Sequence, residues 1–97
     1  MRNIEELIKI LQTHKDELNH QYGIMEIGVF GSYIKNQPND TSDLDILVEF
    51  SRAVDLFTFV NLKNYLSELL NVNVDLVMKK ALKPKIGQRI LREVKYI

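Results

Sequence analysis

The chain has 97 residues and no cysteine, and its 13 basic and 13 acidic side chains give a formal net charge of zero. This length predicts a single domain over residues 1–97, and the lack of cysteine excludes a disulfide framework, a thiolate metal site and a cysteine nucleophile. Because no run of 18 apolar residues is present and the N-terminus lacks the apolar core of a signal peptide, we expect no membrane contact and a cytoplasmic location.

The charges are unevenly distributed along the chain. Residues 79–97 carry seven basic side chains and one acid, a net charge of +6, whereas residues 1–78 carry six basic and twelve acidic side chains, a net charge of −6. The basic segment could complement the acidic body, bind phosphates or contact an acidic partner, or it could be a solvated helix face. The overall neutrality argues against a dedicated nucleic-acid binder.

In chain order, periodic apolar residues predict a helix over residues 4–23, with Asn3 as its N-cap and Gly23 at its end. Its apolar stripe comprises Ile4, Leu7, Ile8, Leu11, Leu18 and Tyr22. A buried strand is predicted over residues 24–30. Residues 32–36 are long enough for one or two helical turns before Pro38.

The second half predicts a strand over residues 44–50, a helix over 55–71, a strand over 72–78 and a helix over 83–94. The inner face of the helix predicted over 55–71 is expected to comprise Leu56, Val60, Leu66, Leu69 and Leu70. Tyr96 and Ile97 are expected to pack against the sheet, and His14 and His20 to lie on the surface. The alternation predicts an α/β fold with a small mixed sheet of about three strands and helices packed against it, with strand order left open.

Two acids open the second predicted strand. Asp43 and Asp45 are separated by one residue, so they share a face of the strand with Cα atoms about 6.6 Å apart. Carboxylates placed in this way can hold a magnesium ion that also binds substrate phosphates. The alternative interpretation is a strand that begins with two solvated acids.

A glycine and a serine follow the first predicted strand. Gly31 permits a sharp turn with positive φ and a close backbone approach to a ligand, and Ser32 adds a hydroxyl at the start of the short helical segment. A turn that leads into a helix N-terminus is suited to binding an anion. The alternative is an ordinary strand-to-helix turn.

Asp75 is a lone acid within the apolar pattern of the third predicted strand, where an unpaired buried carboxylate would be costly. If this strand lies beside the second, Asp75 joins Asp43 and Asp45. Three carboxylates could then hold two metal ions about 3.5–4 Å apart. The alternative is an acid at a strand edge.

Together these features resemble the polymerase-β-like nucleotidyltransferase superfamily, whose signature is a hydrophobic-Gly-Ser turn, about ten residues, an Asp-x-Asp pair and a later third acid. The short length and the basic C-terminal segment resemble its minimal nucleotidyltransferase (MNT) branch. The resemblance implies that Gly31, Ser32 and Lys35 hold the nucleotide. It also implies that Asp43, Asp45 and Asp75 form the catalytic triad that binds Mg²⁺. Lys35 stands where the family usually has an arginine, and it lacks the planar bidentate guanidinium.

The same resemblance implies a biological role. MNT proteins are commonly antitoxins that transfer AMP from ATP to a tyrosine of a HEPN-type ribonuclease toxin and so inactivate it, which implies a hetero-oligomer with that toxin. Two alternatives stay open at this stage. The chain could neutralise a toxin by binding and occlusion without catalysis, or it could transfer AMP to a small molecule or to RNA ends.

Overall fold

The computed structural model describes residues 3–31 and 43–97 of the chain. Its helices are α1 (Ile4–Tyr22), α2 (Leu56–Leu70) and α3 (Pro84–Glu93), with a 3₁₀ turn η1 (Lys79–Ala81). Its strands are β1 (Ile24–Phe30), β2 (Leu44–Phe50), β3 (Val74–Met78) and β4 (Lys95–Tyr96). The helical turns predicted for residues 32–36 lie outside the described residues. No described helix is both long enough and apolar enough to cross a membrane.

The strands form one mixed sheet in the order β3-β2-β1-β4, with β2 parallel to β3 and β1 antiparallel to both of its neighbours. This confirms the predicted α/β class. The prediction of about three strands missed β4, which pairs Tyr96 with Gly28 and Lys95 with Val29. Two residues are too few to show the alternation that identifies a strand.

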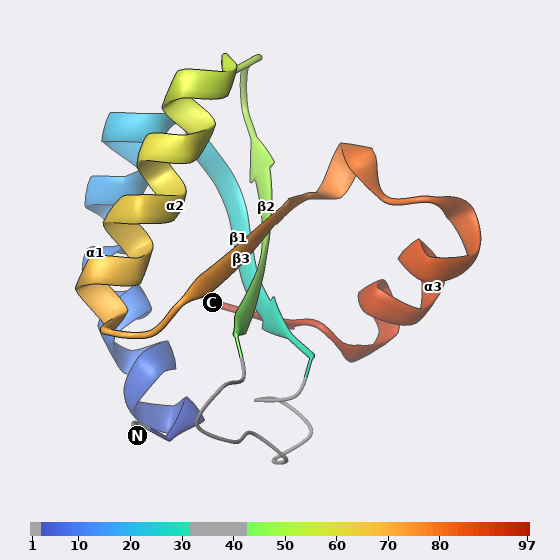
Figure 1. Cartoon of the computed structure of the whole chain (residues 1–97), viewed down its shortest axis with the longest axis horizontal. Helices are drawn as coiled ribbons and strands as arrows, with labels where there is room; N and C mark the ends of the chain where they lie inside the picture. Colours follow the sequence, from blue (N-terminus) through green and yellow to red (C-terminus); the bar gives the residue numbers. More distant parts are fainter. Residues whose placement is uncertain (1–2, 32–42) are drawn as a thin grey trace.

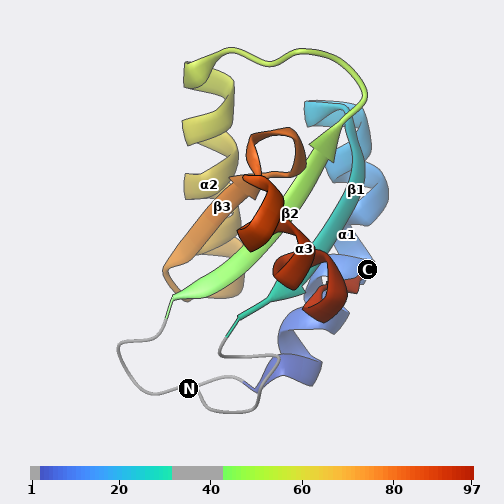
Figure 2. The same cartoon turned by 90° about the vertical axis from the view of Figure 1, so that its right-hand side faces the viewer.

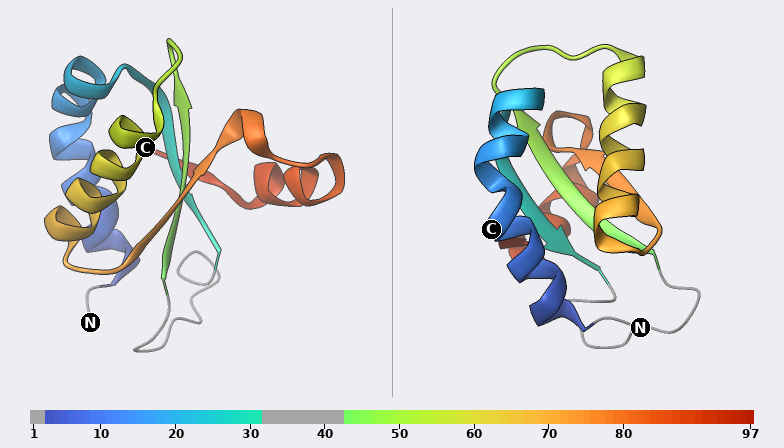
Figure 3. Two further views of the ribbon diagram at one scale, coloured as in Figure 1. Left: turned by 45° about the horizontal axis from the view of Figure 1, so that its top comes forward. Right: turned by 90° about the vertical axis from the view of Figure 1, so that its left-hand side faces the viewer.

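Helices α1 and α2 cover one face of the sheet, as Figure 1 and the right-hand view of Figure 3 show. The predicted stripe of α1 is confirmed for its leucines, because Leu7, Leu11 and Leu18 are buried in the core. Ile4 and Tyr22 pack against that core. Ile10, which the stripe did not include, also packs against it, whereas the predicted Ile8 is half-buried. The predicted ends are confirmed as well. The Asn3 side chain accepts a hydrogen bond from the Glu6 amide at 2.9 Å, and Gly23 ends the helix in the left-handed conformation with a φ of 68°.

The inner face of α2 was predicted only in part. Leu66 and Leu70 are buried together with Leu62, but Leu56 and Val60 are 72% and 43% exposed. The three buried leucines repeat every four residues and form one row on the helix. Leu56 and Val60 lie two positions out of that row, and two residues turn a helix by roughly 200°. Apolar residues on both sides of α2 made its periodicity ambiguous.

The opposite face of the sheet lies toward η1 and α3, which Figure 2 shows in front of the strands. Along β2, Leu44, Ile46 and Val48 belong to the core beneath α1 and α2, so Leu47 points to this second face, where it is only 1% exposed. Lys79 ties η1 to β1, because its Nζ lies 3.5 Å from Oε1 of Glu26.

Most of the basic C-terminal segment is solvated. Lys79 is half-buried, whereas the other six basic residues are exposed: Lys80, Lys83, Lys85, Arg89, Arg92 and Lys95. Lys79 also lies over the Tyr96 ring, 5.7 Å from its centroid, and Arg89 Nε is 3.5 Å from Oε1 of Glu93 within α3. The alternative of a solvated helix face therefore describes α3 well, while Lys79 complements the acidic body.

Gly28 allows the C-terminal segment to approach β1 closely. A Cβ atom at this position would lie 2.6 Å from Cγ2 of Val94 and 3.1 Å from the Lys95 carbonyl oxygen. We expect Gly28→Ala to lower the free energy of unfolding by about 1–3 kcal/mol through overpacking, as measured by urea denaturation. Gln12→Ala on the exposed side of α1 is the control, with an expected change within about 0.5 kcal/mol. A stabilised Gly28→Ala variant would contradict this packing.

Candidate active site

The parallel pairing of β2 with β3 brings two acids together. Asp45 and Asp75 are partners in this register. Their neighbours Leu44, Ile46, Val74 and Leu76 all belong to the core beneath α1 and α2. Because side chains alternate along a strand, both carboxylates therefore face the other side of the sheet. Asp45 is half-buried and Asp75 is exposed, so the pair forms a partly open acidic site.

Gly31 lies against Asp45, one member of this pair. It follows β1 directly, and the preceding residue, Phe30, is the partner of Asp45 in the antiparallel β1–β2 register. Its φ of 83° is in the left-handed region that favours glycine, and a Cβ atom on Gly31 would overlap the Asp45 carboxylate. The glycine turn and the Asp-x-Asp segment thus meet in space. Ser32 and Lys35, which the sequence places in the same site, lie outside the described residues.

Asp43 is held differently from Asp45. Its Oδ1 accepts a hydrogen bond from Nδ2 of Asn73 at 2.8 Å, and the Leu44 amide donates to the Asn73 carbonyl oxygen at 2.8 Å. Asn73 was not among the predicted site residues. Its position offered a signal, because Asn73 precedes Asp75 by two residues and so lies on the same face of an extended chain.

The pKa of Asp45 is raised from 3.8 to about 6. Burial is the largest cause, followed by repulsion from Asp75, a side-chain hydrogen bond with Asp75 and repulsion from Asp43. The sequence had suggested Asp75 as the costly buried acid. The structure assigns that place to Asp45 instead, because β2 is an interior strand with β1 and β3 on either side, whereas β3 is the sheet edge.

The donor set fits a magnesium ion. Asp45 and Asp75 supply carboxylate oxygens, and no basic side chain among residues 3–31 and 43–97 forms an ion pair with either of them. Within those ranges no three acids are grouped closely enough to hold a metal ion together. Asp43 begins the same segment, and its Oδ1 is joined to Asn73. Magnesium is usually held by one or two carboxylates together with water and substrate phosphates, so two converging acids are sufficient.

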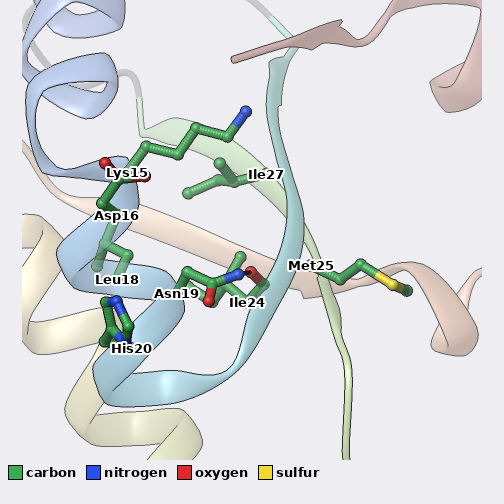
Figure 4. Close-up of a pocket in the computed structure, with 8 residues that line it drawn as sticks. All are labelled: Lys15, Asp16, Leu18, Asn19, His20, Ile24, Met25 and Ile27. Carbon is green, nitrogen blue, oxygen red and sulfur yellow. Dashed lines mark hydrogen bonds between the residues drawn. The ribbon is translucent and has the colours of Figure 1, made fainter.

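A separate small cavity lies between α1 and β1, at the opposite end of β1 from Gly31 (Figure 4). Its volume is about 100 Å³, and Nδ2 of Asn19 donates a hydrogen bond across it to the Ile24 carbonyl oxygen at 2.7 Å. His20 lines this cavity and is exposed, as predicted, whereas His14 is half-buried and its Nδ1 donates to the Ile10 carbonyl oxygen at 2.9 Å. The cavity therefore lies at the packing interface of α1 with β1 and is separate from the acidic site.

The raised pKa of Asp45 predicts how stability depends on pH. Between about pH 4 and pH 6 the folded protein binds more protons than the unfolded chain, so the free energy of unfolding falls as pH rises through this window. Asp45→Asn removes the ionised carboxylate. We expect it to stabilise the metal-free protein by about 1–2 kcal/mol at pH 7.5, and by little at about pH 4, in urea denaturation.

Asp16→Asn on α1 is the control for this experiment, because Asp16 is an exposed acid on a helix, remote from the pair. Its free energy of unfolding should change by less than about 0.5 kcal/mol at both pH values. An equal gain for Asp45→Asn at both pH values would show that the effect comes from something other than ionisation of this carboxyl group.

Comparison with known proteins agrees with this geometry. The sequence matches the Nucleotidyltransferase domain family over residues 11–97. It is 47% identical over 97 residues to a protein of Thermococcus cleftensis named protein adenylyltransferase MntA, covering 100% of this chain and 98% of the relative. It is 43% identical over 98 residues to a candidate protein adenylyltransferase of Methanocaldococcus jannaschii, covering 100% of both chains.

Solved structures show the same fold. A candidate minimal nucleotidyltransferase superimposes with a TM-score of 0.82 at 32% identity, over 97% of this chain and 95% of that one. A toxin–antitoxin structure with AMP-PNP superimposes with a TM-score of 0.71 at 25% identity, over 98% of this chain and 72% of that one. With its acidic pair beside a glycine turn, the chain belongs to the nucleotidyltransferase domain family, in the minimal nucleotidyltransferase branch that its sequence resembles.

Proposed function

We propose that this chain is the antitoxin of a HEPN/MNT pair and that it transfers AMP from Mg²⁺–ATP to a tyrosine of the HEPN toxin. The observation that carries the proposal is the Asp45–Asp75 pair on adjacent strands, with Gly31 against Asp45. The relative named protein adenylyltransferase MntA and the structural neighbour with AMP-PNP support the same activity and nucleotide. We further propose that residues 1–97 act as one domain and that the acceptor tyrosine belongs to a separate protein.

The nucleotide would be held at the end of the sheet where β1 finishes and β2 begins. Gly31, Ser32 and Lys35 are the proposed phosphate-binding residues. At Gly31 the missing side chain lets the Asp45 carboxylate lie directly against the backbone of the turn. Asp43, Asp45 and Asp75 are the proposed metal ligands and catalytic residues. When bound, Mg²⁺ supplies positive charge that stabilises the phosphates as they react.

The transfer itself joins the tyrosine to the nucleotide. The tyrosine Oη forms a bond to the α-phosphorus of ATP, the bond from that phosphorus to the bridging oxygen of the β-phosphate breaks, and pyrophosphate leaves. The phenolic proton passes to the Asp75 carboxylate, which is the more exposed member of the pair and so the more accessible to an acceptor on another protein. Asp45, on the interior strand, would serve as a ligand of the Mg²⁺ ion that accompanies the nucleotide.

Intact-mass measurement on the partner protein tests this proposal. The chain is incubated with ATP, Mg²⁺ and its HEPN partner, and the partner should gain one or more AMP-sized mass increments. Asp45→Asn should lower the rate of transfer at least about 100-fold, because it removes a proposed ligand of the cation that stabilises the reacting phosphates. Asp16→Asn should transfer AMP at the wild-type rate.

Toxin neutralisation in the same experiment separates catalysis from occlusion. The double variant Asp43→Asn/Asp45→Asn should fold, lose AMP transfer and fail to neutralise the toxin. If that variant neutralises the toxin although the partner stays unmodified, neutralisation occurs by occlusion and the catalytic proposal is wrong. An unmodified partner with the wild-type chain would also refute the transfer.

A further inference from the structure

The acidic pair is preceded by a second cross-strand pair of a different kind. In the parallel β2–β3 register, Leu44 is opposite Val74 and Asp45 is opposite Asp75. Asp43 and Asn73 directly precede Leu44 and Val74, and they are joined by the 2.8 Å hydrogen bond from Nδ2 of Asn73 to Oδ1 of Asp43. The site therefore consists of two adjacent rows across β2 and β3. One row holds two carboxylates, and the other holds a carboxylate and an amide.

Hydrogen bonds on both sides of the segment fix the backbone at Asn73, and so fix the point from which its side chain extends. Its carbonyl oxygen accepts a hydrogen bond from the Leu44 amide at 2.8 Å, so the β2–β3 ladder continues one residue beyond β3. The next amide, of Val74, donates to Oγ of Ser67 on α2 at 3.1 Å, and that hydroxyl donates to the Lys63 carbonyl oxygen at 2.9 Å. The end of α2 thus supports the segment that carries Asn73.

An amide at this position has a specific chemical consequence. Because it is a neutral donor, it orients Asp43 without offsetting the negative charge that would attract a cation. The hydrogen bond engages Oδ1 of Asp43, and no other residue of the described ranges donates to its Oδ2. A basic side chain in the same place would also orient Asp43, but its charge would compete with a metal ion for the carboxylate.

We infer that Asn73 is a positioning residue that holds the Asp43 carboxylate toward the metal–nucleotide site. This inference rests on the proposed function, because it concerns the same site. Outer-shell hydrogen bonds to ligating carboxylates commonly affect metal affinity about 10- to 100-fold. Since Asn73 and Asp43 are both exposed, we expect an effect at the lower end of this range.

Calorimetric binding of Mg²⁺–AMP-PNP to the free chain tests the inference without any turnover. Asn73→Leu has nearly the same shape but no donor, and its Kd for Mg²⁺–AMP-PNP should rise about 10-fold. Its affinity for AMP-PNP in EDTA and its melting temperature should match those of the wild type. Asn73→Gln keeps the donor on a longer side chain and should recover part of the loss, with a rise in Kd of less than about 3-fold.

Asn64→Leu is the matched control, because Asn64 is an exposed asparagine on α2 and should tolerate the same exchange with no change in Kd. Wild-type binding by Asn73→Leu would overturn the role of Asn73 and leave the proposed function intact. An equal loss of affinity with Mg²⁺ and in EDTA would also overturn it, since that result indicates a structural defect. If the wild type itself shows no Mg²⁺-dependent binding, the proposed function fails, and the inference fails with it.

Discussion

The parallel pairing of β2 with β3 is the constraint on which the site depends. Parallel neighbours need a crossover, and α2 supplies it while its leucines Leu62, Leu66 and Leu70 pack into the core. Once α2 is seated, the register places Asp45 opposite Asp75 and turns both away from the helices. A shift of one of these strands by one residue would reverse its two faces and turn its acid toward the helices. Burial of the apolar residues therefore also determines where the carboxylates meet.

The site brings together carboxylates that repel each other, and packing of the hydrophobic core keeps them in place. Two carboxylates on adjacent strands repel each other, and burial adds to the cost by raising the pKa of Asp45 to about 6. The residues that alternate with the acids are fully or almost fully buried: Leu44, Ile46, Val74 and Leu76. Their burial holds the strands together despite the repulsion. A metal–nucleotide complex would relieve the repulsion, so the same charges that destabilise the free site favour ligand binding.

Several features were predictable because they depend on local sequence. The stripe of α1, its Asn3 cap and the left-handed Gly23 follow from periodicity and from the conformational preferences of single residues. Other features were not predictable. The two residues of β4 acquire strand geometry only by pairing with Gly28 and Val29. Leu56 and Val60 of α2 are apolar but exposed, because the docking of a helix on a sheet selects one of its apolar faces.

The same division applies to the site. The sequence by itself determined which residue types are present and their spacing. The Asp-x-Asp pair, which shares one face of a strand, indicated a candidate magnesium and phosphate site, and the resemblance to a known family then implied nucleotidyl transfer. Only the tertiary structure decided which acids meet. It placed Asp45 against Asp75 and Gly31, and it paired Asp43 with Asn73. These contacts join residues 14 to 30 positions apart, and they depend on strand order and register, which local pattern does not encode.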